Sequence, residues 1–184
     1  LRVARFLGND MATFLDQADV TGTIPQMIDE AEKFVARNTR HGIRIVGFQH
    51  VNVHEYPNEA IREAITNALC HRDWGLVGQQ VRVAIFDDRI FVDSPGRLPP
   101  GVTLENIERV HVLRNPVIAQ LLYDVEYIEN WGSGVPRMKR AMRAYSLPAP
   151  IFDEPGPNFT ATFTGPGERF MRELEVRPAW MAWL

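Results

Sequence analysis

Apolar and polar residues alternate in several segments of the chain, and a period of two is typical of half-buried strands. The alternation predicts strands over residues 1–6, 12–22 and 158–164, and an extended segment over residues 42–57. Residues 79–96 alternate on both sides of an Asp-Asp-Arg sequence and stop at Pro-Gly, which predicts a β-hairpin. We therefore expect a mostly antiparallel sheet.

Other segments repeat apolar residues every three or four positions, as one face of a helix does. Thr23 is a suitable N-cap for the first of them, and Pro57 suits the first turn of the second. The predicted helices span residues 23–38, 57–71, 114–125 and 132–145, with a short helix opening at Thr103. Together these elements predict an α+β fold, a two-layer sandwich with helices packed on one face of the mixed sheet.

Composition and charge limit the classes of function. An apolar fraction of 45% and a charged fraction of 23% are those of an ordinary globular protein. The net charge of −3 gives no overall positive field that would recruit nucleic acid. The one cysteine, Cys70, excludes an internal disulfide framework and favours a reducing, cytoplasmic location. No apolar run is long enough for a membrane span, so we expect no membrane partner.

A row of polar side chains runs along one side of the second predicted helix. Glu63 and Asn67 are one turn apart and His71 follows one turn later, so the three project from one side. A carboxylate can deprotonate a water molecule, and an amide oxygen beside it is a neutral ligand for Mg²⁺. The same spacing fits a solvated helix face that ends on a histidine interacting with the helix dipole.

Two enzyme classes are excluded by missing motifs. The His-Arg-Asp sequence at residues 71–73 occurs in the protein-kinase catalytic loop, but that loop needs an asparagine where this chain has Gly78. We expect Arg72 and Asp73 to form a structural ion pair at the helix end instead. A helicase motor is excluded because the chain has no G-x-x-x-x-G-K-[S/T] loop.

Histidines on the extended segment are a weaker candidate for a metal site. Because no carboxylate or cysteine accompanies them at a recognised spacing, we expect them to face solvent. The residues concerned share one strand face: His50, Asn52 and His54.

Three blocks of sequence, taken in order, resemble one known family. The blocks are NEAIREAITNALCHRDWG, VRVAIFDDRIFVDSPGRLPPGVTLENI and RNPVIAQLLYDVEYIENWGSGVPRMKRAM. The family is the ATP-binding domain of bacterial and archaeal proteins described as transcriptional regulators or as RecG-helicase-like C-terminal segments. It is a divergent branch of the GHKL ATPases, which include DNA gyrase and histidine kinases. The resemblance covers roughly residues 45–165 and implies the GHKL, or Bergerat, sandwich.

The resemblance also implies a division of the chain. Residues 1–40 resemble the end of an AlbA/Schlafen-like domain, residues 41–165 the GHKL-like domain, and residues 166–184 a tail or linker. Because the chain opens on Leu1 inside a strand pattern, we expect a fragment of a longer protein.

The GHKL motifs imply roles for individual residues. In the first motif, E-x-x-x-N, Glu63 is the candidate general base and Asn67 the candidate Mg²⁺ ligand. The second motif, D-x-G-x-G, is matched by residues 93–98, in which Asp93 would read the adenine amino group and Gly96 also fits. In the third, G-x-G-x-G at a helix start, backbone N–H groups hold phosphate. The residues matching it are Gly132, Ser133 and Gly134.

The chain departs from these motifs at two positions, Leu98 and Pro136, which stand in place of glycines. Proline has no N–H group to donate to a phosphate. Basic residues can compensate, because Arg137, Arg140 and Arg143 recur at i, i+3 and i+6 on the last helix with Lys139 nearby; the same four residues fit a solvated helix face equally well. Arg114 and Asn115, in the lid region, are also candidates for phosphate contact, and they equally fit a cap of the helix that starts at Pro116.

Two functions follow from the resemblance. The first is an ATP-binding regulatory domain of a transcriptional regulator, with Mg²⁺ as cofactor and at most weak ATPase activity. The second is a non-catalytic GHKL-like scaffold for homodimerisation or partner binding, with a degenerate nucleotide pocket. In both we expect DNA to be contacted only through modules outside this fragment.

Overall fold

Eight strands and four helices form the part of the chain that the computed structural model describes, residues 1–46, 48–128, 133–170 and 172. The strands are β1 (Arg2–Phe6), β2 (Phe14–Asp19), β3 (His41–Val46), β4 (Gln49–His54), β5 (Arg82–Ile85), β6 (Arg89–Pro95), β7 (Ile151–Asp153) and β8 (Asn158–Thr164). The helices are α1 (Ile24–Asn38), α2 (Asn58–Cys70), α3 (Pro116–Asp124) and α4 (Gly134–Ala144).

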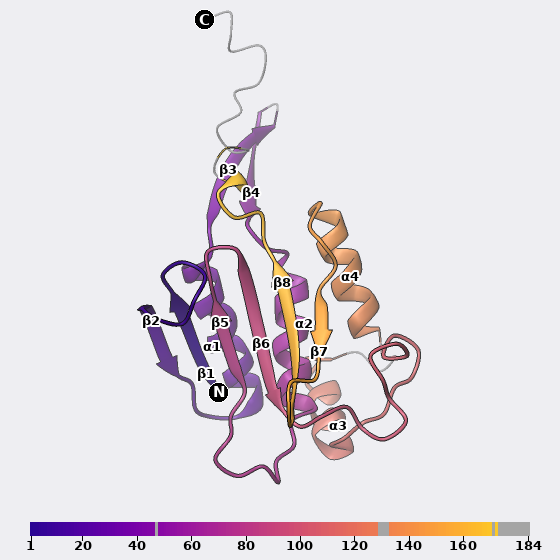
Figure 1. Cartoon of the computed structure of the whole chain (residues 1–184). Helices are drawn as coiled ribbons and strands as arrows, with labels where there is room; N and C mark the ends of the chain where they lie inside the picture. Colours follow the sequence, from indigo (N-terminus) through magenta and orange to yellow (C-terminus); the bar gives the residue numbers. More distant parts are fainter. Residues whose placement is uncertain (47, 129–132, 171, 173–184) are drawn as a thin grey trace, which may run out of the picture.

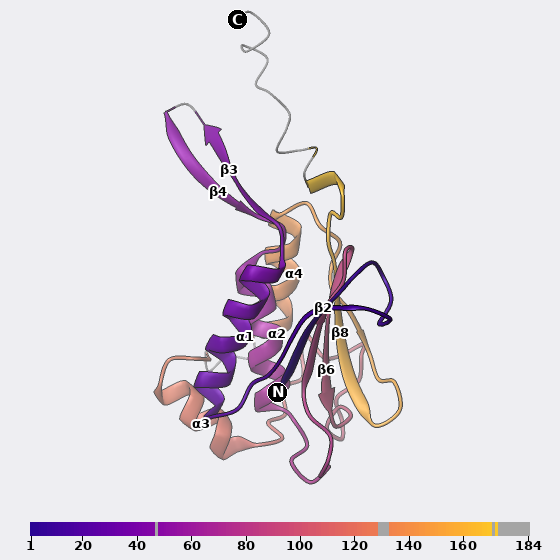
Figure 2. The ribbon, with the colours of Figure 1, turned by 90° about the vertical axis from the view of Figure 1, so that its left-hand side faces the viewer.

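Six of the strands form one sheet in the order β2-β1-β5-β6-β8-β7 (Figure 1). β1 and β5 pair in parallel, whereas the other neighbours pair antiparallel. β3 and β4 form a separate antiparallel hairpin that projects away from the sheet (Figures 1 and 2). The expectation of a mixed, mostly antiparallel sheet is confirmed.

The helices α1, α2 and α4 lie on one face of the sheet (Figure 2). α2 is the central helix, because it contacts α1, α4 and β6. Burial of apolar side chains between the two layers is the main stabilising contribution. The largest fully buried core residues include Phe34, Ile65, Leu69, Ile90, Met142 and Phe163. The predicted two-layer α+β sandwich is thus confirmed.

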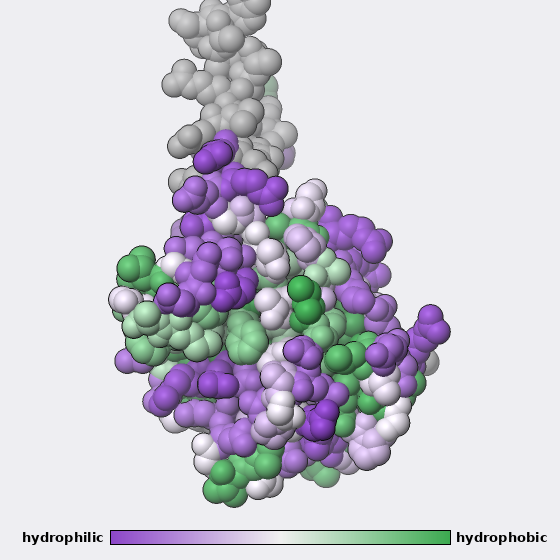
Figure 3. All heavy atoms as spheres, viewed as in Figure 1, coloured by the Kyte–Doolittle hydropathy of each residue, from purple (hydrophilic) through white to green (hydrophobic). Residues whose placement is uncertain are grey.

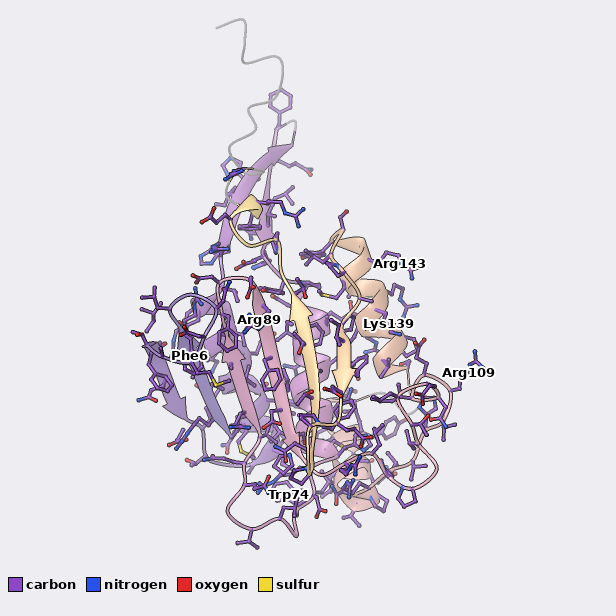
Figure 4. The ribbon with its side chains drawn as sticks, in the orientation of Figure 1. Phe6, Trp74, Arg89, Arg109, Lys139 and Arg143 are labelled. Carbon is purple, nitrogen blue, oxygen red and sulfur yellow. The ribbon has the colours of Figure 1, made fainter. Side chains whose placement is uncertain are left out.

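The opposite face of the sheet carries a small aromatic cluster. The rings of Phe6 and Phe86 stack with centroids 5.2 Å apart, and Phe14 lies 4.6 Å from Phe6. Figure 3 shows green side chains gathered on the left of this face, and Figure 4 labels Phe6 there. No helix of the described residues covers this face (Figure 2), yet Phe6 and Phe86 are each only 4% exposed.

Local sequence explains the start of α1. Thr23 is the N-cap: its side chain accepts a hydrogen bond from the backbone N–H of Gln26, and the Gln26 side chain accepts one from the N–H of Thr23. This reciprocal capping box satisfies two donors at the helix start. The prediction that Thr23 caps the helix is confirmed.

Three local predictions need correction. Residues 42–57 do not form one extended segment, because the chain reverses between β3 and β4. The short helix expected from Thr103 is a series of turns, in which the Asn106 side chain accepts from the Thr103 N–H at 2.7 Å. β7 lies in a Pro-rich stretch for which the alternation predicts no strand.

Residues 1–40 supply β1, β2 and α1, so they share the sheet and the core with the rest of the chain. Tyr127 Oη, for example, donates to the Asp29 carboxylate on α1 at 2.8 Å. No helix in the described ranges is long and apolar enough to cross a membrane.

Candidate functional site

A cavity of about 430 Å³ lies where α2, the β6–β8 pair, α3, and the start of α4 meet. The segment between β6 and α3 also lines it, with apolar side chains such as Leu98, Val102 and Val112. Clefts of this size that combine apolar walls with a few polar groups are typical ligand sites.

Glu63 and Asn67 lie side by side on the cavity wall formed by α2. The Asn67 Nδ2 donates to Glu63 Oε1 at 3.0 Å, as their i,i+4 spacing allows. The Glu63 side chain is only 18% exposed, and its other oxygen lies 3.6 Å from Arg137 Nη1. The structure therefore joins the first predicted motif to a cation on α4.

The start of α4 packs directly on these two side chains. Gly134 is close enough that a Cβ there would lie 2.4 Å from Glu63 Oε1 and 2.9 Å from Asn67 Nδ2. Ser133 is the N-cap residue, and its Oγ accepts from Arg137 Nη2 at 3.3 Å. Pro136 occupies the first turn, where helix N–H groups have no partner within the helix. Gly132 lies outside the described residues.

The N–H groups of Gly134 and Val135, in the first turn of α4, have no acceptor within the helix itself. Both residues line the cavity. Because such groups carry partial positive charge, this end of α4 favours an anion. The proline removes one donor without removing the other two.

Gly96 and Arg114 lie together at the end of α2. Gly96 adopts a φ of +110°, which favours glycine, and a Cβ there would lie 2.7 Å from Asp73 Cβ. Arg114 Nη1 lies 3.5 Å from Asp73 Oδ2, and its other terminal nitrogen donates to the Arg97 carbonyl. Both Gly96 and Arg114 line the cavity.

The expected ion pair between Arg72 and Asp73 is replaced by other contacts. Asp73 pairs with Arg114, while Arg72 donates to the Gln79 carbonyl at 2.5 Å. The Arg72 guanidinium also stacks 4.4 Å from the ring centroid of Trp74. Asn115 completes the junction, because its Nδ2 donates to two carbonyls at the end of α2, those of Cys70 and Arg72, at 2.8 Å each. The His-Arg-Asp segment thus anchors a helix end.

Asp93 is not brought to the cavity. Successive residues of a strand face opposite sides of the sheet, and Asp93 lies on the side away from the helices. It is 2% exposed and is held by Arg82, at 2.7 and 2.8 Å, and by Asn158 Nδ2, at 2.9 Å. The Asp93 carboxylate therefore forms a structural ion pair and is not open to a ligand in the cavity.

Ser94, the next residue of β6, lines the cavity and was not among the predicted site residues. Its Oγ donates to the Ala68 carbonyl on α2 at 2.8 Å. The spacing of D-x-G-x-G, counted back from Leu98 and Gly96, falls on Ser94. That spacing is the signal that was available in the sequence. Leu98 also lines the cavity, and its N–H donates to Glu154 Oε1 at 2.7 Å.

Two titratable groups at the end of α2 are perturbed by their surroundings. Burial lowers the pKa of His71 below its usual value, and the nearby Arg114 charge lowers it further. His71 lines the cavity as a neutral imidazole near pH 7. Burial raises the pKa of the Cys70 thiol to about 11, so this cysteine is an unreactive thiol.

The other cations of α4 lie away from the cavity. Lys139 pairs with Glu108, and Arg140 and Arg143 are exposed. Figure 4 shows Arg143, on α4, on the outer side of the molecule. Of the basic residues considered on this helix, Arg137 alone lines the cavity in the described ranges.

Acidic, histidine and cysteine side chains do not gather into a metal site of their own. Within the described residues no group of three or more of them could hold a metal ion. The register of the hairpin places His54 opposite His41, and His50 is exposed. The exposure of His50 agrees with the expectation that the histidines of this strand face solvent.

The comparison with protein families now bears on this geometry. Residues 78–163 match the model of the family described as "Putative ATP-dependent DNA helicase recG C-terminal". The matched segment includes Gly96, Arg114, Ser133, Gly134 and Arg137, whereas the α2 pair, Glu63 and Asn67, precedes it.

A solved structure resembles the chain over a wider range than the family model does. The crystal structure of the DIP2311 protein from Corynebacterium diphtheriae superposes with a TM-score of 0.81 and 28% sequence identity. The similarity covers 90% of this chain but 34% of that protein, so this chain spans about a third of its length. No curated protein matches the chain.

Proposed function

We propose that this chain is a nucleotide-binding domain that holds ATP with Mg²⁺ and regulates a longer protein, a transcriptional regulator, to which it belongs. The description of the matched family as ATP-dependent supports the nucleotide. The regulatory role rests on the resemblance of its sequence blocks to domains of transcriptional regulators. Contact with DNA is assigned to modules outside this chain, because the net charge is −3.

One observation carries the proposal: a single cavity gathers groups suited to a nucleotide from separate segments. α2 supplies the Glu63–Asn67 pair, and the start of α4 supplies two N–H donors and Arg137. The β6–α3 segment supplies an apolar wall. The carboxylate and amide of α2 suit a metal ion, and the N-terminus of α4 suits the phosphates. The apolar wall suits the base of a nucleotide.

The residues present fit Mg²⁺ bound through a nucleotide. Mg²⁺ usually takes one or two protein ligands and completes its shell with water and phosphate oxygens. Because the Asn67 NH₂ group donates to Glu63, the Asn67 amide oxygen is left as the ligand atom. When bound, the ion would neutralise phosphate charge beside the N-terminus of α4.

Glu63 has a position from which it can act on a water molecule. It lies one helical turn from the proposed Mg²⁺ ligand and directly against Gly134, where the phosphates would end. Arg137 Nη1 lies 3.6 Å from the Glu63 carboxylate, and the Arg137 guanidinium would be shared between Glu63 and a phosphate group. We therefore infer a weak ATPase at most, in which Glu63 is the general base.

A second function is favoured by specific contacts. Arg137 pairs with both Glu63 and Glu59, Leu98 N–H is bonded to Glu154, and Pro136 has no N–H. Such internal pairing is what a scaffold with a degenerate pocket would retain. In that case the chain would mediate dimerisation or partner binding without nucleotide.

Calorimetric titration of Mg-ATP into the chain tests the proposal. We expect saturable binding that weakens roughly tenfold to hundredfold in Arg137→Ala and in Asn67→Ala, because each removes a charged or metal-mediated contact. Arg143→Ala is the matched control: it removes a cation from the same helix, but one that does not line the cavity.

Two results would contradict ATP binding at this site. No heat at millimolar Mg-ATP would favour the scaffold, which sedimentation of the nucleotide-free chain would then test for dimers. Equal loss of affinity in Arg137→Ala and Arg143→Ala would show that general charge, and not the cavity, attracts the nucleotide.

A further inference from the structure

The β3–β4 hairpin stands apart from the rest of the described chain (Figures 1 and 2). Its two strands pair with each other and with no other strand of the described residues. Apolar side chains are exposed on it, those of Ile43, Phe48 and Val51. A two-stranded hairpin is at best marginally stable in water unless a further strand or a packed layer supports it. The hairpin therefore has the character of an element that a partner completes.

One edge of β4 offers free backbone groups. Antiparallel pairing uses the N–H and C=O groups of every second residue on each strand. The Glu55 N–H donates to the Arg40 carbonyl at 2.9 Å directly after β4, so this pair is hydrogen-bonded and fixes the alternation. Along the register, the residues of β4 that turn their backbone groups away from β3 are His50, Asn52 and His54. β3 is the only strand next to β4 in the described ranges, so these groups face no strand.

β4 lacks the features that usually protect a free strand edge. Such edges carry charged residues, a proline or a bulge. β2, at the edge of the large sheet, follows this rule: it carries Asp16 and Asp19, and its pairing with β1 shifts register between Arg5 and Phe6. β4 reads Gln-His-Val-Asn-Val-His, without a carboxylate, lysine, arginine or proline, and its register with β3 is regular. The edge of β4 is therefore open to another strand.

The sequence of β4 is symmetric about Asn52. Residues 50–54 read His-Val-Asn-Val-His in both directions. When two copies pair their β4 strands antiparallel about a two-fold axis at Asn52, each residue meets its own type. His50 lies opposite His54 of the other copy, and Val51 lies opposite Val53. This register pairs the backbones at His50, Asn52 and His54, the same residues whose groups face outward. β3 reads His-Gly-Ile-Arg-Ile-Val and has no such symmetry over its length.

We propose that β4 is a self-association edge, at which two copies of this chain pair antiparallel about Asn52 and join their hairpins into one four-stranded sheet. The pairing gives partners to the free N–H and C=O groups of both strands. It also brings Val51 of each copy against Val53 of the other, in non-hydrogen-bonded pairs whose side chains approach closely. Two-fold interfaces between identical chains need a self-complementary surface, which this edge provides.

The dimer does not depend on nucleotide, because no residue of the described hairpin lines the cavity. One strand from each copy makes a small interface, so we expect weak, reversible association. Sedimentation equilibrium of the nucleotide-free chain measures it. A wild-type chain that stays monomeric at about 1 mM, where even weak interfaces associate, would overturn the proposal.

Two proline variants test which edge pairs. Asn52→Pro removes an N–H group that faces away from β3, so the hairpin keeps its own ladder while the β4 edge is blocked. Ile43→Pro is the matched control: Ile43 lies opposite Asn52, and its N–H faces away from β4 on the other edge. We expect the dimer affinity to fall about tenfold or more in Asn52→Pro and to stay at the wild-type value in Ile43→Pro. Equal loss in both variants would overturn the assignment to the β4 edge.

Disulfide formation tests the register. The Cα atoms of a hydrogen-bonded antiparallel pair are about 5.5 Å apart, a separation that a disulfide spans. Asn52→Cys places two thiols against each other at the axis, so oxidised glutathione should yield a covalent dimer. Ile43→Cys, on the opposite edge, should stay monomeric, and the native Cys70 is buried. Equal crosslinking of both variants, or none in Asn52→Cys, would overturn the proposal and leave nucleotide binding untouched.

Discussion

Gly134 lies directly against Glu63, so that the backbone at the start of α4 takes the space of a side chain. A Cβ at Gly134 would approach Glu63 Oε1 to 2.4 Å, a distance that real contacts do not tolerate. The close approach brings the helix N–H donors to the carboxylate and amide of α2. We infer that glycine is required here for packing and not for backbone conformation.

The substitution Gly134→Ala is expected to displace Glu63 or the first turn of α4. Because the atoms in the way are the ends of the flexible Glu63 and Asn67 side chains, which can shift, the loss of unfolding free energy should lie near the low end of the about 1–3 kcal/mol typical of overpacking. Nucleotide affinity should fall as well, because donors and carboxylate are separated. Chemical denaturation and Mg-ATP titration measure the two effects.

Gly8→Ala provides the control for Gly134→Ala. Gly8 has a φ of +74° with open space around the position of a Cβ, so alanine there introduces backbone strain alone. We expect this variant to lose stability but to bind nucleotide normally. If Gly8→Ala also lost nucleotide binding, reduced stability alone would explain the loss of binding in both glycine variants.

Glu63→Gln is expected to slow any ATP hydrolysis by about a hundredfold or more, while leaving nucleotide affinity within a fewfold of the wild type. The amide keeps the shape of the side chain but cannot act as a general base. Steady-state phosphate release at saturating Mg-ATP provides the measurement.

Glu59→Gln is the matched control, because Glu59 lies one turn earlier on α2 and approaches the same Arg137 guanidinium at 3.7 Å. Its side chain is 62% exposed and does not line the cavity. Hydrolysis should be unchanged in this variant. If both variants slowed equally, the ion pair with Arg137, and not proton transfer at Glu63, would be the relevant interaction.

The relation between Glu63 and Asn67 was predictable because helix geometry is local. Residues four apart on a helix are neighbours whatever the rest of the chain does. The alternation of strands gave β1, β6 and β8 for the same reason. The reversal between β3 and β4 carried a weaker signal, since only two residues, Gly47 and Phe48, separate two runs that are both extended.

The face on which a residue of β6 lies was harder to predict. Asp93 and Ser94 are both buried, at 2% and 5% exposure, so the usual contrast between a polar and an apolar side is absent at this end of the strand. Only the pairing with β8 and the packing of α2 decide which one meets the cavity. The contact of Arg114 was equally hard to predict, because its partner Asp73 is distant in sequence.

His71 gives a prediction for the effect of pH on stability. Its pKa in the folded chain is lowered by burial and by Arg114, whereas the unfolded chain has the ordinary value near 6.5. Below pH 6.5 the unfolded state therefore binds more protons, and stability falls as pH falls. The contribution of His71 is fully present above pH 7.

The substitution His71→Gln should make the free energy of unfolding less sensitive to a change from pH 7.5 to 5.5. Urea denaturation at both pH values, with His50→Gln as the control, measures the difference. His50 is exposed on the hairpin, so its removal should leave the pH dependence as it is in the wild type. A pH dependence unchanged in His71→Gln would mean that this imidazole titrates alike in both states.

The buried Glu55 forms an ion pair with the partly exposed Arg40 beside the β3–β4 hairpin. Arg40 donates to the two Glu55 oxygens through its backbone N–H at 2.9 Å and Nη1 at 3.0 Å, and the Glu55 side chain is 5% exposed. Arg40→Ala would leave a buried carboxylate without its cation, a change that typically costs about 3–5 kcal/mol. The exposed pair of Arg2 and Asp19 is the control, and Arg2→Ala should change stability little.

The loss in Arg40→Ala is expected to shrink as the pH is lowered. Burial raises the pKa of Glu55 even with Arg40 present, so the folded state takes up a proton above the unfolded value near 4.5. A protonated Glu55 needs no cation, and its contribution to stability is lost as pH rises through the folded pKa. Denaturation of Arg40→Ala and of Arg40→Ala/Glu55→Gln at pH 5 and pH 7 tests this. The double variant should recover much of the loss at pH 7; if it does not, the guanidinium stabilises the fold through its bond to the Asp87 carbonyl and not through Glu55.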